Sequence, residues 1–325
     1  MEVARLEEYL GVGPLTLERF SGGYSNLTYQ VTAGERHWVL RKAPPGANIR
    51  GAHDMGREFR ILSAVYQVFP KVPRPWRFCD DETVLGQPFF LMERVEGEIL
   101  RGHQGGPPER MARLSRELAV QLAGLHGLDV DQLGLREWDK GEGYIERQVS
   151  GWIARWHKAE GPGGSQLVEY LSAVQMSPSP ACLIHNDFKY DNVVLRGDSE
   201  VAAILDWEMA TVGDPWMDLG TTLGYWVESS DSPKLQALGL GPTHLPGNLT
   251  RREFAEVYME ASGRHRPWDE VEYFYLFGLF KVAVIAQQIF LRYRMGHTRD
   301  ERFARLDVAV RLLLEQAAKV IETRK

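Results

Sequence analysis

The stretch from residue 181 to residue 207 constrains this chain more than any other part of its sequence. It begins with an apolar run and continues into a polar loop that carries Asp187 and Asn192. A turn at Gly197 then separates two further apolar runs, which predicts a hairpin whose second strand ends at Asp206. Three oxygen-bearing side chains are therefore expected to meet at one end of a small sheet.

The spacing within this stretch resembles the phosphoryl-transfer loop of protein kinases. That loop has the pattern His-x-Asp, four residues, Asn, and then an Asp at the end of a later strand. The matching residues here are His185, Asp187, Asn192 and Asp206. Transfer of a γ-phosphoryl group depends on an oriented nucleophile and on cations around the phosphate oxygens. The pattern therefore predicts Asp187 as a general base for a substrate hydroxyl.

The neighbouring residues complete this interpretation. Asn192 and Asp206 offer hard oxygen ligands of the kind that Mg²⁺ prefers, so ATP and Mg²⁺ are the predicted cofactors. Lys189 lies two residues after Asp187, where kinases place a cation near the transferred phosphate. His185 is expected to brace the loop through hydrogen bonds rather than to titrate.

Two other interpretations of the same residues stay open at this point. The Asp and Asn side chains of a surface hairpin can simply make local backbone hydrogen bonds. His185 and Asp187 also match two thirds of a non-haem iron site, which uses two His and one carboxylate. That second interpretation needs a distant His and leaves Asn192 and Asp206 without a role.

Five segments in the first two thirds of the chain carry a more specific resemblance, in the order Ser21 to Asn26, Trp38 to Gly46, His185 to Asn192, Ile204 to Glu208 and Gly213 to Gly220. With these segments the chain resembles the aminoglycoside phosphotransferase and choline kinase family. Within that family it is similar to the kinase-like domain fused to, or encoded beside, acyl-CoA dehydrogenases.

The resemblance implies an α+β, two-lobed, protein-kinase-like fold. The small N-terminal lobe, built on an antiparallel sheet, would cover residues 1–96 and bind the nucleotide. The larger, mainly helical C-terminal lobe would cover residues 97–325 and hold the catalytic and acceptor sites. Asp218 would be structural and brace the catalytic loop.

A glycine-containing loop between two predicted strands is the candidate phosphate cover. Because glycine has no Cβ, backbone N–H groups in such a loop can approach a polyphosphate closely. A plain hairpin turn explains the same glycines. The candidate nucleotide-binding residues in the loop are Ser21, Gly22, Gly23, Tyr24, Ser25 and Asn26.

Four more residues are candidates for nucleotide binding. Kinases place a basic residue on the strand predicted here over 37–42, and either Arg41 or Lys42 fits, since neighbouring side chains on a strand alternate between faces. We choose Arg41, with Glu58 on the following helix as its partner. The resemblance also implies that backbone groups of Glu93 and Val95 contact the adenine edge.

Composition limits the partners that can be expected. The chain has 325 residues, 44% of them hydrophobic and 25% charged, as in ordinary globular proteins. Its net charge of −6 argues against a nucleic acid or a membrane surface as the main partner. Cys79 and Cys182 form no disulfide or metal pattern, which fits a reducing cytoplasm. The apolar stretch Tyr273–Leu291 contains Lys281 and is interpreted as a core helix.

Helical periodicity dominates the remaining sequence. It predicts helices from Pro108 to His126, from Tyr144 to Lys158, and near 251–262, 268–294 and 299–323. Residues 229–250 are expected to form a long loop of the kind that often covers a substrate. In relatives the last helices shape the acceptor pocket.

The sequence therefore predicts an ATP- and Mg²⁺-dependent phosphotransferase acting on a small-molecule hydroxyl. Kinship with the acyl-CoA dehydrogenase-linked domain suggests a hydroxyacyl-CoA or a related metabolite as acceptor, and a functional link to an acyl-CoA dehydrogenase. The alternatives are a choline- or aminoglycoside-type kinase and a nucleotide-binding pseudokinase that serves as a regulatory module.

Overall fold

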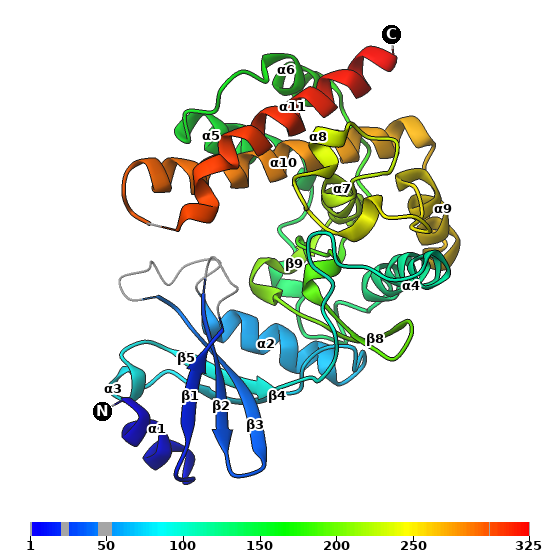
Figure 1. The fold of residues 1–325 in the computed structure, drawn as a ribbon. Coiled ribbons are helices and arrows are strands. Elements are labelled where there is room, and N and C mark those ends of the chain that lie inside the picture. Colours follow the sequence, from blue (N-terminus) through cyan, green and yellow to red (C-terminus); the bar gives the residue numbers. More distant parts are fainter. Residues whose placement is uncertain (1, 21–25, 45–53, 299, 325) are drawn as a thin grey trace.

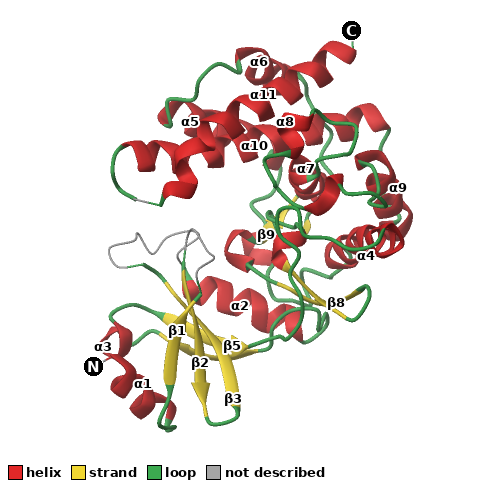
Figure 2. Ribbon diagram, viewed as in Figure 1, coloured by secondary structure: helices red, strands yellow, loops and turns green. Residues whose placement is uncertain are grey.

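The chain divides into a lobe built around a β-sheet and a larger lobe built from helices (Figure 1). The computed structural model describes residues 2–20, 26–44, 54–298 and 300–324. In Figure 2 the large sheet is separate from most of the helices, and it comes from the N-terminal part of the chain. The predicted α+β class with two lobes is confirmed.

A five-stranded antiparallel sheet forms the centre of the smaller lobe, in the order β1-β2-β3-β5-β4. The strands are β1 (Thr16–Arg19), β2 (Leu27–Ala33), β3 (Arg36–Lys42), β4 (Pro75–Cys79) and β5 (Phe89–Glu93). Two sets of helices cover its two faces, namely α2 (Met55–Tyr66) on one face and α1 (Glu2–Leu10) with α3 (Glu82–Leu85) on the other. Because side chains alternate along a strand, Phe90 packs with α2 whereas Leu91 packs with α1.

Helix α10 (Trp268–Arg294) runs through the larger lobe and packs against α7 (Pro215–Tyr225) and α11 (Leu306–Thr323). The other helices are α4 (Pro108–His126), α5 (Tyr144–Lys158), α6 (Ser165–Ala173), α8 (Pro233–Gln236) and α9 (Arg251–Ser262). Among the described residues, α10 alone is long and apolar enough to cross a membrane, but 72% of its most apolar window is buried inside the protein. It packs as a core helix.

The backbones of α7 and α10 touch because glycines face each other where the helices cross. A Cβ at Gly278 would lie 1.8 Å from the carbonyl oxygen of Gly220, and a Cβ at Gly224 would lie 2.5 Å from the carbonyl carbon of Gly278. Both distances are impossible for real atoms, so only glycine permits this approach. The contact brings polar side chains of both helices beneath one loop, residues 185–192.

That loop lies between two small sheets on the side of the larger lobe that faces the five-stranded sheet (Figure 2). Strand β6 (Cys182–Ile184) precedes the loop and pairs with β9 (Thr211–Gly213). Strands β7 (Val193–Arg196) and β8 (Glu200–Ile204) follow it and pair with each other, and Asp206 lies two residues after the end of β8. The order of strand, polar loop, hairpin and carboxylate is the predicted one.

Two expectations for the C-terminal half are wrong. Residues 229–250 are not a featureless loop, because they contain α8 and a 3-10 turn at Pro242–His244. Asp231 ties this segment to α9. Its carboxylate accepts a hydrogen bond of 2.7 Å from Nη1 of Arg251, the first residue of that helix. The last helix begins at Leu306 rather than near 299, after a 3-10 turn.

The sequence interpretation also missed α6. The apolar face of α6 is short, with Leu167 and Leu171 buried, so its periodicity is weak. Asp214 is the N-cap of α7, since its side chain accepts a 2.8 Å bond from the N–H of Trp216. Asp218 lies one turn further along α7 and accepts hydrogen bonds from the loop of residues 185–192.

Candidate active site

His185 is a buried anchor for the loop that follows it. Its Nδ1 accepts the N–H of Asp187 at 3.2 Å, and its Nε2 donates to the carbonyl of Leu205 at 2.9 Å. A carbonyl can only accept and an N–H can only donate, so these two contacts define a neutral tautomer. Burial also lowers the pKa of His185, which agrees with the expected bracing role.

Asp187 is held on three sides by groups from its own loop and from α7. Nζ of Lys189 lies 2.9 Å from each carboxylate oxygen, and Nδ2 of Asn192 donates to Oδ2 at 2.8 Å. The hydroxyl of Tyr225, at the end of α7, is a further hydrogen-bond partner of both Asp187 and Lys189. Burial opposes the charge of Lys189, but Asp187 together with Tyr225 and Asp206 outweighs burial and raises the lysine pKa. Lys189 therefore keeps its positive charge at neutral pH.

Asp206 lies beside the Lys189–Asp187 pair, two residues after the end of β8, in a left-handed backbone conformation with φ 66°. Burial would raise its pKa, but the nearby guanidinium of Arg41, with smaller contributions from Lys189 and His185, outweighs burial and lowers the pKa of Asp206. Lys189 is in turn influenced by both Asp187 and Asp206, so the two carboxylates border the same space.

Arg41 reaches this space from the five-stranded sheet. Its Nη2 contacts Asp206 at 2.9 Å and Glu208 at 3.1 Å, while its Nε lies 3.3 Å from Glu58 on α2. Burial opposes the charge, but the three carboxylates outweigh it and raise the pKa of Arg41 above its usual value. The amide of Asn26 also donates to Glu208, at 2.7 Å. One basic side chain thus joins the two lobes.

Lys42 points to the other face of the sheet. Its Nζ contacts Glu2 on α1 at 3.3 Å and the carbonyl of Leu85 at 3.2 Å. The alternation along β3 and the position of α2 decide this choice, since Arg41 shares the face that α2 covers. Arg41 rather than Lys42 borders the candidate site.

The other residues predicted to contact the nucleotide are the loop from Ser21 to Ser25, Glu93 and Val95. Ser21, Gly22, Gly23, Tyr24 and Ser25 lie outside the described residues. The N–H of Glu93, at the end of β5, donates to the carbonyl of Arg74 at 2.8 Å, which removes that donor from those available to a ligand. Val95 lies in the connection between β5 and α4, where the expected boundary between residues 96 and 97 also falls.

The structure adds three residues that the sequence interpretation did not assign to the site. Glu208 could have been noticed as a second carboxylate two residues after Asp206. Tyr225 and Lys281 carry no local signal, because each meets the loop only through the packing of α7 and α10. Asp218 has the bracing role that the resemblance implied, since its carboxylate accepts the N–H groups of His185 and Asn186, both at 2.7 Å.

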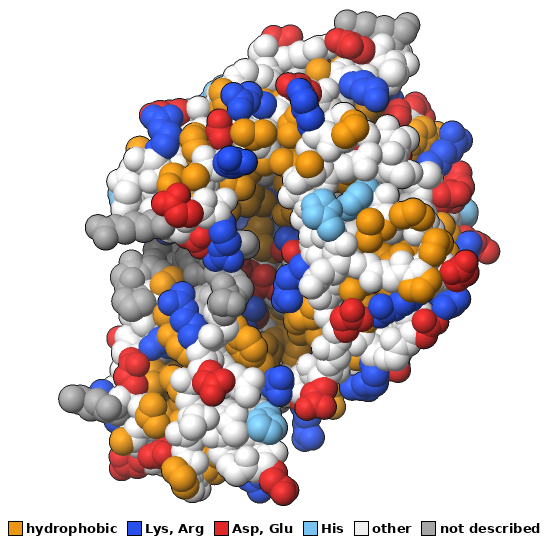
Figure 3. All heavy atoms as spheres, viewed as in Figure 1, with side chains coloured by type: hydrophobic (Ala, Val, Ile, Leu, Met, Phe, Trp, Pro, Cys, Tyr) orange, Lys and Arg blue, Asp and Glu red, His pale blue; other side chains and the backbone are white. Residues whose placement is uncertain are grey.

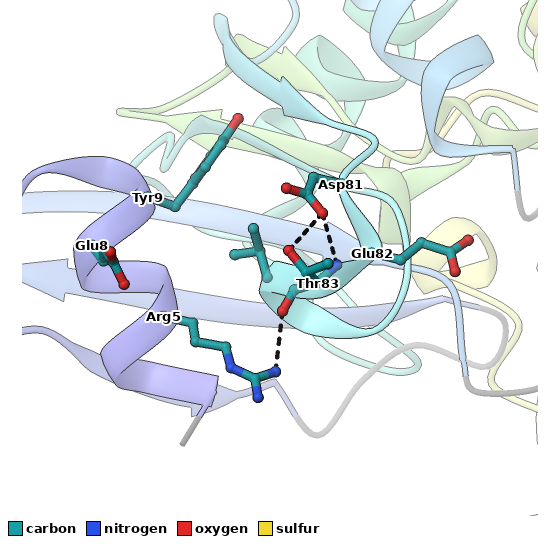
Figure 4. Close-up of a pocket in the computed structure, with 7 residues that line it drawn as sticks. Arg5, Glu8, Tyr9, Asp81, Glu82 and Thr83 are labelled. Atoms are coloured by element: carbon teal, nitrogen blue, oxygen red, sulfur yellow. Dashed lines mark hydrogen bonds between the residues drawn. The ribbon is translucent and has the colours of Figure 1, made fainter.

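A hollow opens between the two lobes in Figure 3, with acidic and basic side chains along its walls. A second depression, of about 580 Å³, lies on the far side of the sheet between α1 and α3 (Figure 4). Arg5 spans it and donates to the carbonyl of Thr83 at 3.1 Å. This depression lies on the face that carries Lys42, away from the catalytic loop.

Comparison with known proteins settles the family. The sequence profile described as the phosphotransferase enzyme family matches residues 16–271, most of the chain. The chain belongs to the phosphotransferase enzyme family. Acyl-CoA dehydrogenase family member 11 of Rattus norvegicus is 33% identical to this phosphotransferase family member over 299 residues, which make up 88% of this chain and 38% of that protein. The predicted kinship is confirmed, and the chain spans well under half the length of the curated relatives it matches.

Solved structures show the same fold for this family member. A Ralstonia eutropha protein assigned as an aminoglycoside phosphotransferase has a TM-score of 0.78 at 24% identity, over 97% of this chain and 98% of that one. Choline kinase from Cryptosporidium parvum has a TM-score of 0.60 at 11% identity, over 95% and 90%. An ADP-bound aminoglycoside phosphotransferase has a TM-score of 0.55 at 17% identity, over 97% of each chain. At such identities the likeness establishes the kinase-like fold alone.

Proposed function

We propose that this protein transfers the γ-phosphoryl group of ATP to a hydroxyl group of a small molecule. The observation that carries the proposal is the position of the Asp187 carboxylate, which is held by Lys189 and Asn192 beside the Asp206–Arg41 pair. Membership of the phosphotransferase enzyme family supports small-molecule phosphoryl transfer in general. The ADP-bound structural neighbour supports an adenine nucleotide as donor.

The proposed step is an in-line displacement at the γ-phosphorus. The acceptor oxygen forms a bond to phosphorus, the bond between phosphorus and the β–γ bridging oxygen breaks, and ADP leaves. Asp187 takes the proton of the acceptor hydroxyl. Lys189 and Arg41 offset negative charge on the phosphate oxygens, and Arg41 is suited to this because its guanidinium can contact two oxygens at once.

The side-chain oxygen atoms of Asn192 and Asp206 are of the kind that would hold a magnesium ion together with the nucleotide. Among the described residues no three His, Cys, Asp or Glu side chains form a complete metal site. The amide oxygen of Asn192 and the carboxylate of Asp206 are hard donors, and Mg²⁺ commonly takes one or two protein ligands together with phosphate oxygens and water. A bound ion would supply charge neutralisation on the phosphates.

The acceptor is proposed from kinship. Because the relatives are named as acyl-CoA dehydrogenases, we propose a hydroxyacyl-CoA or a related metabolite as the acceptor and a functional link to an acyl-CoA dehydrogenase. An aminoglycoside acceptor is less well supported, since its cationic groups call for a dense acidic wall and the acceptor side shows no acidic run in the sequence.

The experiment is a phosphorylation screen with a matched variant. The purified protein is incubated with MgATP and 4-hydroxypentanoyl-CoA, choline or kanamycin, and products are identified by mass spectrometry. Phosphorylated 4-hydroxypentanoyl-CoA is the expected product. Preferred turnover of choline or kanamycin would reject the acceptor, and absence of any transfer to these acceptors or to water would overturn the proposed function in favour of a binding module.

Asp187→Asn is the first prediction at this site. The variant keeps the size of the side chain but cannot accept the proton, so turnover should fall by about 10²–10⁴-fold. Binding of MgATP, followed as a shift in melting temperature, should be retained. Turnover equal to that of the parent protein would show that Asp187 is not the base.

A further inference from the structure

Lys281 is a buried lysine in the middle of α10 that reaches the catalytic loop from beneath. Its side chain is almost completely enclosed, at 2% exposure. Its Nζ donates to the carbonyl of Asn186 at 2.9 Å, to Oδ1 of the same residue at 3.1 Å and to Oγ1 of Thr221 at 3.3 Å. An ammonium group has three N–H donors and no acceptor, so the three oxygens match its charged form.

The charged groups around Lys281 do not form an ion pair with it. Asp218 on α7 and Asp187 in the loop favour its charge from a distance, whereas Lys189 in the loop and Arg155 on α5 oppose it. No carboxylate within the described ranges lies at salt-bridge distance from Nζ. Burial outweighs these influences and lowers the pKa of Lys281 to about 8. A buried cation without a direct counter-ion costs stability, so its placement calls for another role.

Asn186, the residue that Lys281 holds, has a left-handed backbone with φ 67° and lies directly before Asp187. Every polar group of Asn186 is engaged. Its N–H donates to Asp218 at 2.7 Å, its Nδ2 donates to the carbonyl of Met209 at 3.1 Å, and its side chain also bonds to Tyr144. Its carbonyl and its amide oxygen are the two groups that face Lys281.

The bond to the Asn186 carbonyl matters because that carbonyl shares a peptide plane with the N–H of Asp187. The N–H side of this plane is fixed by Nδ1 of His185, and the carbonyl side is fixed by Lys281. A planar peptide held at both ends sets the direction in which the Asp187 side chain leaves the backbone.

We propose that Lys281 is a positioning residue for phosphoryl transfer, whose buried ammonium holds Asn186 in its left-handed conformation and thereby aims the Asp187 carboxylate at the acceptor. This inference rests on the function proposed above. Lys281 touches neither the nucleotide nor the acceptor and acts through the backbone. The charged form is the active one, because a neutral amine has only two donors for three acceptors.

Two opposite pH dependences follow. Turnover of the parent protein falls as the pH rises through about 8, where Lys281 loses its proton. The free energy of unfolding changes in the other direction. Between pH about 8 and pH 10.5, the ordinary pKa of a lysine, the unfolded chain binds the Lys281 proton more readily than the folded chain does. The stability of the parent relative to a variant without the amine therefore rises over this interval.

The test compares the parent with Lys281→Met, Lys281→Arg and Gln287→Met. Gln287 is a matched control, because it is buried on the same helix but donates to the carbonyl of Ala159 at 2.9 Å instead of to the loop. ADP release is measured from pH 6.5 to 9.5 with MgATP and either 4-hydroxypentanoyl-CoA or water as acceptor. Melting temperatures are measured over the same range with and without MgATP.

We expect Lys281→Met to lose turnover at least about tenfold at pH 7 while still binding MgATP, since small misplacements of a reacting group are costly. Lys281→Arg should recover most of the turnover and show no alkaline decline, because a guanidinium stays charged. Gln287→Met should keep the turnover and the pH profile of the parent.

An active parent protein combined with an unchanged pH profile in Lys281→Met and Lys281→Arg would overturn the inference and leave the proposed function intact. Equal losses in Lys281→Met and Gln287→Met would do the same, because they would assign Lys281 a merely structural role. If Lys281→Met fails to fold, the alkaline limb of the parent and its absence in Lys281→Arg decide the matter. An inactive parent would instead count against the proposed function.

Discussion

Glu58 is a buried carboxyl group whose charge depends on two opposing influences. It is 3% exposed, and burial raises its pKa to about 7 although the guanidinium of Arg41 lies 3.3 Å away and acts in the opposite direction. Protonated Glu58 is therefore favoured in the folded protein at mildly acidic pH. Above about pH 7 it ionises and can orient Arg41 as a full ion pair.

Glu58→Gln should remove a pH dependence of stability at this residue. Folding raises the pKa of Glu58 from 4.5 to about 7. The neutral acid therefore contributes its full stabilisation below pH 4.5, and this contribution is lost as the pH rises through about 7. The variant should therefore gain about 3 kcal/mol relative to the parent over this interval. Thermal unfolding of both proteins from pH 4.5 to 8 measures the difference, and parallel curves would contradict the assignment.

Helix α7 presents one face to the catalytic loop, and two polar side chains on that face, Asp218 and Tyr225, contact the loop. Asp218 accepts two N–H groups of the loop and a bond of 3.0 Å from Nε2 of His126. Burial opposes its charge, but His126 and His185 together outweigh burial and lower the pKa of Asp218. Tyr225, two turns further along the same face, contacts Asp187. The helix is a support to which the loop is tied.

Asp218→Asn should weaken this support. An amide in place of the carboxylate presents N–H groups to other N–H donors, and losing one partner of a buried pair costs about 3–5 kcal/mol. Melting temperature and turnover should fall together. The matched control is Thr222→Val, because the hydroxyl of Thr222 is buried on the same helix and bonds to no described residue. An equal loss in both variants would show that general packing, and not the loop contacts, is responsible.

At the scale of the whole molecule, Arg41 is the link between the lobes. It extends from β3 of the sheet lobe to Asp206 and Glu208 of the helical lobe, whereas Lys42 makes its contacts inside the sheet lobe. Two adjacent basic residues on one strand therefore serve different parts of the molecule.

Replacing these two residues should separate catalysis from local stability. Arg41→Met should lower kcat/KM for ATP by about 10²-fold, because a charge that stabilises the phosphates is lost. Lys42→Met should leave kcat/KM within about threefold of the parent and lower only the melting temperature, since its partner Glu2 is exposed. Steady-state kinetics at varied ATP test both, and a larger kinetic defect in Lys42→Met would contradict the assignment of Arg41.

The local sequence predicted the elements and the spacing of the central polar residues. Apolar segments on either side of the glycine-containing loop indicated strands of the sheet lobe, β4 was missed, and helical periodicity indicated most of the large helices. The pattern from His185 to Asp206 predicted the loop and hairpin, because these residues are close in the chain and their geometry follows from one turn and two strands.

Tertiary packing decided the rest, because the partners are far apart in the sequence. The face that α2 covers decided between Arg41 and Lys42, and the approach of α7 to α10 through Gly220 and Gly278 decided where Lys281 meets the loop. Lys281 and Asn186 are 95 residues apart, so no local pattern joins them. Sequence spacing can place groups that share one hairpin, whereas groups on separate elements meet only once the core has packed.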